Sequence, residues 1–292
     1  MKFPDYKEQE TILAQCRLEA DRFSLPIKKH LLRGLAGNIK ASGQGNSIDF
    51  KDHRQYMPGD DPRYINWHAY ARTEQYTMKV YHEEVRPTID LILDNSHSMV
   101  FENDKTIRTL ECLFFCVYSA FKSGIKLNFH TSNQLNKALH TENIINARLT
   151  EEHFTRDSHH LASLNNLKLS KGSLRIFISD LLFSDDPMNC LKHLSSAGCS
   201  LIILAPTTLS ERDPDWNGHM EFIECENGVR NHQYITPAKL NDYKKSYQMH
   251  FAQWRELCLK YGALFSHSKC EIAFSDYLSQ QALNDTIVQP AS

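Results

Sequence analysis

Three oxygen-bearing side chains occupy alternate positions directly after an apolar run. The chain reads LILDNSHSM from Leu91 to Met99, which places Asp94, Ser96 and Ser98 behind the run. One carboxylate and two hydroxyls suit a hard cation, because Mg²⁺ prefers oxygen ligands, few carboxylates and several waters in octahedral geometry. With few anionic ligands around it, a bound ion would keep an open position. The stretch therefore predicts a site for Mg²⁺ or Mn²⁺ that attracts an acidic group of a partner.

A second apolar run, SLRIFISD, also ends in an acid, Asp180. In open parallel sheets, ligands bind beyond the carboxyl ends of the strands, where the strand order reverses. If the two runs are neighbouring strands, Asp94 and Asp180 meet at one edge of the sheet. The predicted metal ligands are therefore Asp94, Ser96, Ser98 and Asp180. The structural alternative is a turn and helix N-cap, because Asp-Asn-Ser after a strand commonly bonds backbone amides.

The elements that must hold these residues alternate between strands and helices from Pro87 onward. Expected strands span 88–93, 125–130, 173–179 and 200–205. Expected helices span 105–122 and 151–167, with one more after Pro187 and a long one that Thr236 and Pro237 begin and Gly262 ends. The buried face of the helix 105–122 is read from spacings of three and four as Ile107, Leu110, Phe114, Val117 and Phe121. The strand runs are continuously apolar, which predicts an α/β fold with a doubly wound, mostly parallel sheet of Rossmann type.

The chain divides into three regions that differ in composition and in the pattern of apolar residues. Residues 1–86 are polar and punctuated by glycine, and we expect an N-terminal extension of helical and β structure with strands at 47–56 and 76–85. Residues 87–270 form the predicted α/β domain. Residues 271–292 are expected to be a C-terminal tail.

Composition limits the class of protein. The 292 residues are 41% hydrophobic, which suits one or two globular domains. The net charge of −2 would not attract the chain to nucleic acid or to anionic lipid. The N-terminus MKFPDYKEQETILAQC has acids where a signal peptide needs a basic start, and the apolar stretch LFFCVYSAF is too short to span a bilayer. We expect a cytoplasmic chain without a nucleic-acid partner or membrane insertion. The 8 Cys residues show no CxxC spacing and are expected to be buried thiols.

The segment MPGDDPR and its neighbours carry a dense set of charges. Its Pro-Gly and Asp-Pro pairs are turn dipeptides. We expect a buried ion-pair network that holds the first region against the sheet, with Trp67 and Tyr70 beneath it, formed by Arg54, Asp60, Asp61, Arg63 and Arg72. Direct contact of these charges with a ligand is the alternative. Further along the chain, DPDWNGH, from Asp213 to His219, is expected to be a long exposed loop.

Two stretches resemble a known family. Asp94-x-Ser96-x-Ser98 after an apolar strand resembles the metal-ion-dependent adhesion site of von Willebrand factor A-like domains, and Asp180 in ISDLLF resembles the later aspartate of that site. The stretch RQYMPGDDPRYINWHAYARTEQYTMKVYHEE, Arg54–Glu84, is similar to the signature of a bacterial domain-of-unknown-function family whose members carry this A-like domain. Members of that family commonly accompany MoxR-type AAA+ ATPases.

In this family the metal site normally takes a further ligand, a threonine in a segment resembling Gly-Thr-Asp-Leu. The aligned stretch here reads SHHL, from Ser158 to Leu161, and holds no threonine. The oxygens of Asp157, Ser158 or Thr155 could replace it, whereas His159 would favour a softer metal or none.

The resemblance implies a non-enzymatic, metal-dependent interaction module: an adaptor that links a MoxR-type AAA+ ATPase to a client protein, with a chaperone-like or complex-maturation role. The alternative is a metal-dependent hydrolase or phosphotransferase that uses Asp94 and Asp180. A phosphatase of the haloacid-dehalogenase type needs a second Asp two residues after its nucleophile, and that position holds Ser96. A serine hydrolase needs GxSxG, which surrounds neither Ser96 nor Ser98.

Overall fold

The computed structural model describes residues 3–27, 50–81, 88–133, 141–154, 164–183, 186–196, 198–225 and 228–291. The chain divides into two units, a larger one formed by Met1–Gly34 with Pro87–Ser292 and a smaller one formed by Leu35–Arg86. The smaller unit is therefore an insertion between the first helix of the larger unit and its first sheet strand.

A five-stranded sheet forms the centre of the larger unit. Its strands lie in the order β10-β7-β6-β4-β5, and every neighbouring pair is parallel. The strands are β4 (Thr88–Leu93), β5 (Lys126–Thr131), β6 (Leu174–Ile178), β7 (Ser200–Thr207) and β10 (Leu264–Lys269). Since β5 lies on one side of β4 and β6 on the other, the strand order reverses between β4 and β6, as in flavodoxin-like sheets. The predicted parallel α/β fold is confirmed, and β4 has the predicted bounds.

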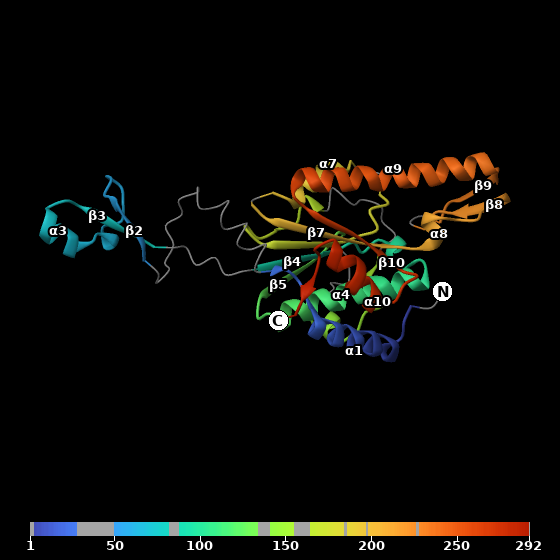
Figure 1. Ribbon diagram of the computed structural model, residues 1–292, viewed down its shortest axis with the longest axis horizontal. Helices are drawn as coiled ribbons and strands as arrows, with labels where there is room; N and C mark the ends of the chain where they lie inside the picture. Colours follow the sequence, from blue (N-terminus) through green and yellow to red (C-terminus); the bar gives the residue numbers. More distant parts are fainter. Residues whose placement is uncertain are drawn as a thin grey trace. The chain divides into compact units, whose positions relative to one another are not determined.

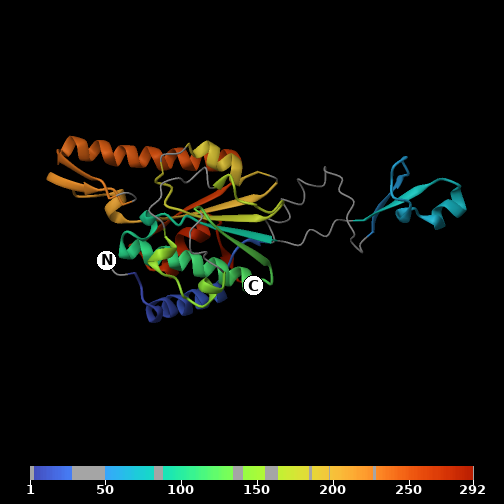
Figure 2. The ribbon, with the colours of Figure 1, turned by 180° about the vertical axis from the view of Figure 1, so that it is seen from behind.

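Helices cover both faces of this sheet. Figure 1 and Figure 2 show α1 (Tyr6–Arg22) and α4 (Asn103–Lys122) on one face, and α7 (Pro187–Leu194) and α9 (Pro237–Tyr261) on the other. The larger unit is thus a three-layered Rossmann-like α/β structure.

The strands of the sheet centre are buried on both faces. Leu91 and Ile176 belong to the cluster of buried side chains that includes residues of α1 and α4, whereas Ile92 and Phe177 belong to the cluster that includes residues of α7 and α9. Successive residues of a strand face opposite sides. Both sets must therefore be apolar, which explains the continuous apolar runs in the sequence.

Shorter elements complete the larger unit. They are β1 (Phe23–Ser24), η2 (His97–Val100), α5 (Thr141–Ile145), η3 (Glu151–His153), α8 (Leu209–Arg212), β8 (Gly218–Ile223), β9 (Arg230–Ile235), α10 (Phe274–Asp276), the π-helical η4 (Tyr277–Ala282) and β11 (Gln289–Pro290). β8 and β9 form an antiparallel hairpin, and β1 pairs with β11. As predicted, α9 begins at the N-cap Thr236 and ends at Gly262, whose φ of 66° suits glycine.

The smaller unit is built on a two-stranded antiparallel sheet. β2 (Phe50–Gln55) pairs with β3 (Thr77–Tyr81), near the predicted strand positions. Between them in the chain lie η1 (Pro62–Tyr64) and α3 (Trp67–Thr73). Ile65 and Met78 are buried in this unit.

The charged residues of the smaller unit form separate local pairs, whereas the sequence predicts one connected ion-pair network. Arg54 donates two hydrogen bonds of 2.7 and 2.6 Å to Asp60, but its side chain is 37% exposed. Arg63 pairs with Asp61 and is 84% exposed. These partners lie within six residues of one another, so the pairs form inside local turns and do not depend on burial against another element.

Trp67 and Arg72 also differ from expectation. Trp67 is 58% exposed, with its ring edge-to-face against Tyr70 at 6.2 Å, and Tyr70 stacks on Tyr76 at 4.4 Å. Arg72 donates to the carbonyl of His68, one turn earlier on α3. A unit of this size buries little surface, so its aromatic rings stay largely at the surface.

The first residues of the chain lie in the larger unit, whereas the sequence predicts one extension over residues 1–86. Helix α1 packs on α4, and its buried side chains in the core cluster include Leu13 and Cys16. The apolar residues of α1 are few and its sequence is otherwise polar, so the sequence does not reveal the surface on which it packs.

The C-terminal segment 271–292 is part of the core, whereas the sequence predicts a tail. Phe274, Tyr277, Leu278 and Ala282 are buried and belong to the cluster that contains β4 and α4 residues. This segment forms α10 and η4 and continues to β11, which pairs with β1.

Three smaller expectations also change. The predicted helix 151–167 starts as the 3-10 turn η3, and residues 155–163 lie outside the described residues. Phe121 is 74% exposed, because it lies in the last turn of α4. The segment Asp213–His219 is not one loop, since its last two residues begin β8 and Trp216 packs against Phe222 and Tyr243.

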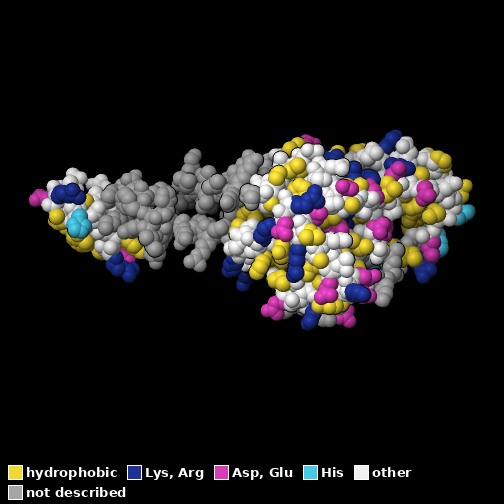
Figure 3. Space-filling view, turned by 60° about the horizontal axis from the view of Figure 1, so that its bottom comes forward, with side chains coloured by type: hydrophobic (Ala, Val, Ile, Leu, Met, Phe, Trp, Pro, Cys, Tyr) yellow, Lys and Arg dark blue, Asp and Glu magenta, His cyan; other side chains and the backbone are white. Residues whose placement is uncertain are grey.

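The structure shows the state of the cysteines and the distribution of surface charge. None of the eight cysteines forms a disulfide, and five are buried as expected, whereas Cys199, Cys225 and Cys270 are only partly buried. Figure 3 shows Lys and Arg side chains interspersed with Asp and Glu over the visible face of the larger unit. Among the described residues, no helix combines the length and the apolar character needed to cross a membrane.

Replacing Leu278 by Ala tests whether the C-terminal segment belongs to the core. Leu278 is 1% exposed, so its truncation leaves a cavity and should lower the free energy of unfolding by about 2–5 kcal/mol. The matched control is Leu259→Ala on α9, where the side chain is 81% exposed and the expected change is below about 0.5 kcal/mol. Urea unfolding measures both, and equal values would show that the segment is a tail.

Candidate functional site

Asp94 lies at the end of the central strand β4. The backbone continues the pairing on both sides, because Asp94 N donates to the Ile178 carbonyl and Ser132 N donates to the last carbonyl of β4, each at 2.8 Å. The Asp94 side chain is buried. Its Oδ2 accepts from Ser179 Oγ at 2.6 Å, and its Oδ1 accepts from Ser96 N at 3.1 Å. The carboxylate is therefore held in one orientation.

Ser96 and Ser98 lie at the 3-10 turn η2, which follows β4. Ser96 is buried, and its Oγ lies 3.0 Å from Ser98 Oγ. Adjacent ligands of an octahedral Mg²⁺ ion stand about 3 Å apart, because each lies about 2.1 Å from the ion. The two hydroxyls therefore have the separation that shared coordination requires.

The alternative of a turn and helix cap accounts for part of this geometry. Asp94 Oδ1 accepts from the amide two residues later, as in an Asx turn. Ser96 is the N-cap residue of η2, yet its side chain makes no capping hydrogen bond. The Ser96 hydroxyl contacts Ser98 instead, so capping alone does not explain the two serines.

Asp180 follows β6, the strand beside β4, so the sheet brings the two predicted acids to one edge. Its Oδ2 accepts from Lys105 Nζ at 2.7 Å, its Oδ1 accepts from the Leu182 amide at 3.1 Å, and Ser98 also hydrogen-bonds the carboxylate. Burial raises the pKa of Asp180, but the Lys105 ammonium and these hydrogen bonds outweigh it and hold the pKa below its usual range. Asp180 is therefore ionised at neutral pH.

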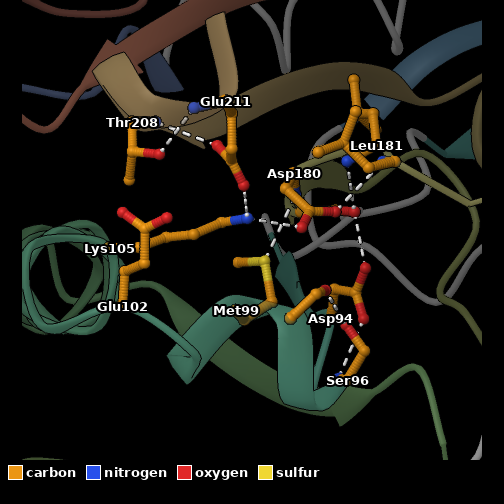
Figure 4. Close-up of polar contacts among 12 residues, drawn as sticks. Asp94, Ser96, Met99, Glu102, Lys105, Asp180, Leu181, Thr208 and Glu211 are labelled. Carbon is orange, nitrogen blue, oxygen red and sulfur yellow. Dashed lines mark hydrogen bonds and ion pairs between the residues drawn. The ribbon is translucent and has the colours of Figure 1, made fainter. Parts of the chain in front are cut away.

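Lys105 connects a third strand end to the site. It lies near the start of α4, and its Nζ is 2.7 Å from Asp180 Oδ2 and 2.5 Å from Glu211 Oε1 (Figure 4). Glu211 lies on α8, after β7, and its Oε2 accepts from Thr208 N at 2.9 Å in a capping box. Burial lowers the pKa of Lys105, but the two carboxylates outweigh this and raise it. The ends of β6 and β7 are thus joined by one ammonium.

The backbone directly after Asp180 is strained. Leu181 has a φ of 60°, a left-handed conformation that costs a non-glycine residue about 1–3 kcal/mol. Its amide donates to Ser179 Oγ at 3.0 Å, and its carbonyl accepts from His250 Nε2 of α9 at 2.9 Å. Because Ser179 also donates to Asp94, it ties one acid to the turn that presents the other. Strained residues of this kind cluster at functional sites.

The candidate site holds more negative than positive charge. Three carboxyl groups, those of Asp94, Asp180 and Glu211, follow three adjacent strands, and Lys105 places one positive charge among them. Buried charges need compensation, and carboxylate and hydroxyl oxygens are ligands that Mg²⁺ accepts. The predicted set of Asp94, Ser96, Ser98 and Asp180 therefore fits such an ion in donor chemistry and in the separation of its hydroxyls.

The sequence also offers further candidate ligands. Asp157 and Ser158, with Thr155 and His159, lie outside the described residues. Within the described ranges, no group of three or more His, Cys, Asp and Glu side chains has the arrangement of a metal site. The predicted set is of another kind, because it joins two acids to two hydroxyls.

Sequence reasoning misses Lys105 and Glu211. Lys105 precedes the buried Thr109 and Cys112 by four and seven residues, so helical spacing places it on the buried face of α4. Glu211 completes Thr208-x-x-Glu211, a capping-box pattern directly after an apolar strand. The helical spacing places Lys105 on a buried face, and the capping box places Glu211 at a helix start. Neither pattern shows that the two side chains, 106 residues apart, form an ion pair.

Comparison with known proteins adds one finding. A family model described as "Protein of unknown function DUF58" matches residues 52–251. No curated protein and no solved structure matches the chain. The matched range includes Asp94, Ser96, Ser98, Asp180 and Lys105.

Asp180→Asn removes a charge that compensates Lys105. Because the variant leaves a buried ammonium with one carboxylate, we expect the free energy of unfolding at neutral pH to fall by about 3–5 kcal/mol. Since the folded pKa of Asp180 is lowered, its contribution is present above the ordinary carboxyl pKa of about 4 and is lost as pH falls through the folded value.

Wild type and Asp180→Asn should therefore converge in strong acid. Urea unfolding at neutral and acidic pH measures this, with the exposed Asp242→Asn on α9 as the matched control. Equal stability of wild type and Asp180→Asn at neutral pH would contradict the compensating ion pair.

Proposed function

The chain belongs to the DUF58 family, and from this premise we propose that it is a non-enzymatic, metal-dependent protein-interaction module with a von Willebrand factor A-like fold. In this proposal Asp94, Ser96, Ser98 and Asp180 hold Mg²⁺ or Mn²⁺, and an acidic side chain of a protein partner binds there. The module acts as an adaptor between a MoxR-type AAA+ ATPase and a client protein.

One observation carries the proposal: the four predicted ligands form one hydrogen-bonded group at the place where the strand order reverses. Asp94 accepts from the Ser96 amide, Ser96 and Ser98 share a contact of 3.0 Å, and Ser98 bonds Asp180. Ligands of open α/β sheets bind at this place. The same four residues carry the resemblance to the adhesion site of A-like domains.

Each residue has a distinct part in this proposal. Asp94 supplies the principal negative charge in a fixed orientation, because Ser179 and the Ser96 amide bond its two oxygens. Ser96 and Ser98 supply neutral oxygens, so they do not cancel the charge of a bound cation. When bound, the cation supplies a positive charge that an acidic side chain can ligate.

The partner class is supported by the smaller unit. Arg54–Glu84 carries the family signature and lies within the matched range. Its side chains Arg63 and Trp67 are 84% and 58% exposed, so neither supports the core of the smaller unit. This agrees with the contact alternative for the charged segment.

Divalent metal should stabilise the fold. The ligands meet only when β4 and β6 are paired, so saturating Mg²⁺ or Mn²⁺ should add about 2–3 kcal/mol to the free energy of unfolding at about a hundred times the Kd. Thermal unfolding should show a higher Tm. Asp94→Asn should abolish the shift, because it removes the charge and keeps the shape, and Ser98→Ala should weaken it.

Asp242→Asn, an exposed position on α9, is the matched control and should keep the full shift. A wild-type curve that Mg²⁺, Mn²⁺ and Ca²⁺ leave unmoved, identical to that of Asp94→Asn, would reduce the group to a structural turn. Turnover of a generic phosphate ester that depends on Asp94 would instead favour a hydrolase or phosphotransferase.

Affinity purification from the native cell tests the partner. The tagged chain should retain a MoxR-type ATPase in the presence of ATP and Mg²⁺, and mass spectrometry identifies it. Asp94→Asn should lose the client or the ATPase while it melts as a folded protein. If the wild-type chain does not retain such an ATPase, the adaptor role is contradicted. The metal site is then still tested separately, by the thermal unfolding experiment.

A further inference from the structure

Lys105 is buried beside the candidate ligand Asp180, and the proposed function gives it no part. Its side chain is 2% exposed and lies between Asp180 and Glu211 (Figure 4). By contrast, Lys122 on the same helix is 44% exposed and pairs with the exposed Asp21. Burial of an ammonium is unfavourable unless carboxylates compensate it. The position of Lys105 therefore needs an explanation beyond packing.

The ammonium is fixed in place. Its contacts of 2.7 Å to Asp180 and 2.5 Å to Glu211 come from two different strand ends. Glu211 is itself held, because its Oε2 accepts from Thr208 N and its backbone carbonyl accepts from Tyr243 Oη of α9 at 2.8 Å. Lys105 is thus a permanent positive charge of the site.

A fixed charge at this position acts on any cation at the candidate ligands. Ser98, a candidate ligand, bonds the carboxylate that Lys105 also bonds. An ion that shares Asp180 with the ammonium would be repelled by it, because charge repulsion between buried groups is poorly screened. Glu211 acts in the opposite sense, since its negative charge offsets part of the ammonium's charge.

We propose that Lys105 is a positioning residue that sets the affinity of the site for divalent cations, with Glu211 moderating its effect. This inference rests on the proposed function. Lys105 bonds one oxygen of Asp180, and its positive charge repels a metal ion at the candidate ligands. The metal ion is therefore bound weakly enough to exchange with metal ions in solution. The pair controls metal occupancy without being a ligand.

Two charge-removing variants should change metal affinity in opposite directions. Lys105→Met keeps the side-chain length and should tighten Mg²⁺ and Mn²⁺ binding by at least about tenfold. Glu211→Gln leaves the ammonium less compensated and should weaken binding by about tenfold. Lys122→Met, on the same helix, is the matched control and should bind as wild type does. Isothermal titration calorimetry of the full chain with MgCl₂ and MnCl₂ gives the Kd values.

A merely structural salt bridge leads to a different result. Both variants would then have a lower Tm without metal, but their Kd values would equal that of wild type. In the proposed role, Mn²⁺ raises the Tm of Lys105→Met more than that of wild type. If Lys105→Met does not fold, Glu211→Gln decides, because glutamine can keep the capping box with Thr208.

The outcomes separate this inference from the proposed function. Equal Kd values for wild type and both variants would overturn the assignment of Lys105 and leave a metal-dependent module standing. Metal binding by Lys105→Met but not by wild type would support Lys105 as the controlling charge and overturn metal dependence of the natural chain. Absence of binding in every variant would overturn both.

Discussion

The parallel pairing of β4 with β6 is the constraint on which the rest of the structure depends. The chain leaves β4 for β5 on one side and returns on the other, so two acids that are 86 positions apart, Asp94 and Asp180, follow neighbouring strands. The amide of Asp94 still pairs with the carbonyl of Ile178, so the backbone at Asp94 stays in line with the sheet. The topology therefore brings like charges to one edge of the sheet in spite of their mutual repulsion.

Ion pairs and hydrogen bonds at this edge join both helical layers to the sheet. Lys105 comes from α4, on one face, and contacts Asp180 and Glu211. From α9, on the other face, Tyr243 bonds the Glu211 carbonyl and His250 bonds the Leu181 carbonyl. The same edge thus holds the candidate ligands and the contacts that lock the layers together. A change of charge at this edge acts on the packing of the unit as well as on what the edge binds.

The sequence predicts the strands and helices of the fold better than the contacts between residues that are far apart in the chain. Continuous apolar runs identify β4 and β6, because strands buried on both faces show no alternation, and the acids that end these runs identify the edge. Lys105 and Glu211 escape detection, since no local pattern connects residues 106 positions apart. Arg63 shows the converse: opposite charges close in sequence pair within one turn, so their density does not predict a network between distant residues. The apolar residues of α1 are too few to show that they pack on α4.

The insertion of the smaller unit into the larger one bears on the order of events during synthesis. Helix α1 packs on α4, and β1 pairs with β11. A nascent chain therefore carries α1 without its partner surface while the whole smaller unit is made, and the β1–β11 pair closes the larger unit only once Gln289 has left the ribosome. The β2–β3 pair lies entirely within the smaller unit, so it can form in that interval. Until α4 arrives, the apolar side of α1 is exposed to any holdase near the ribosome.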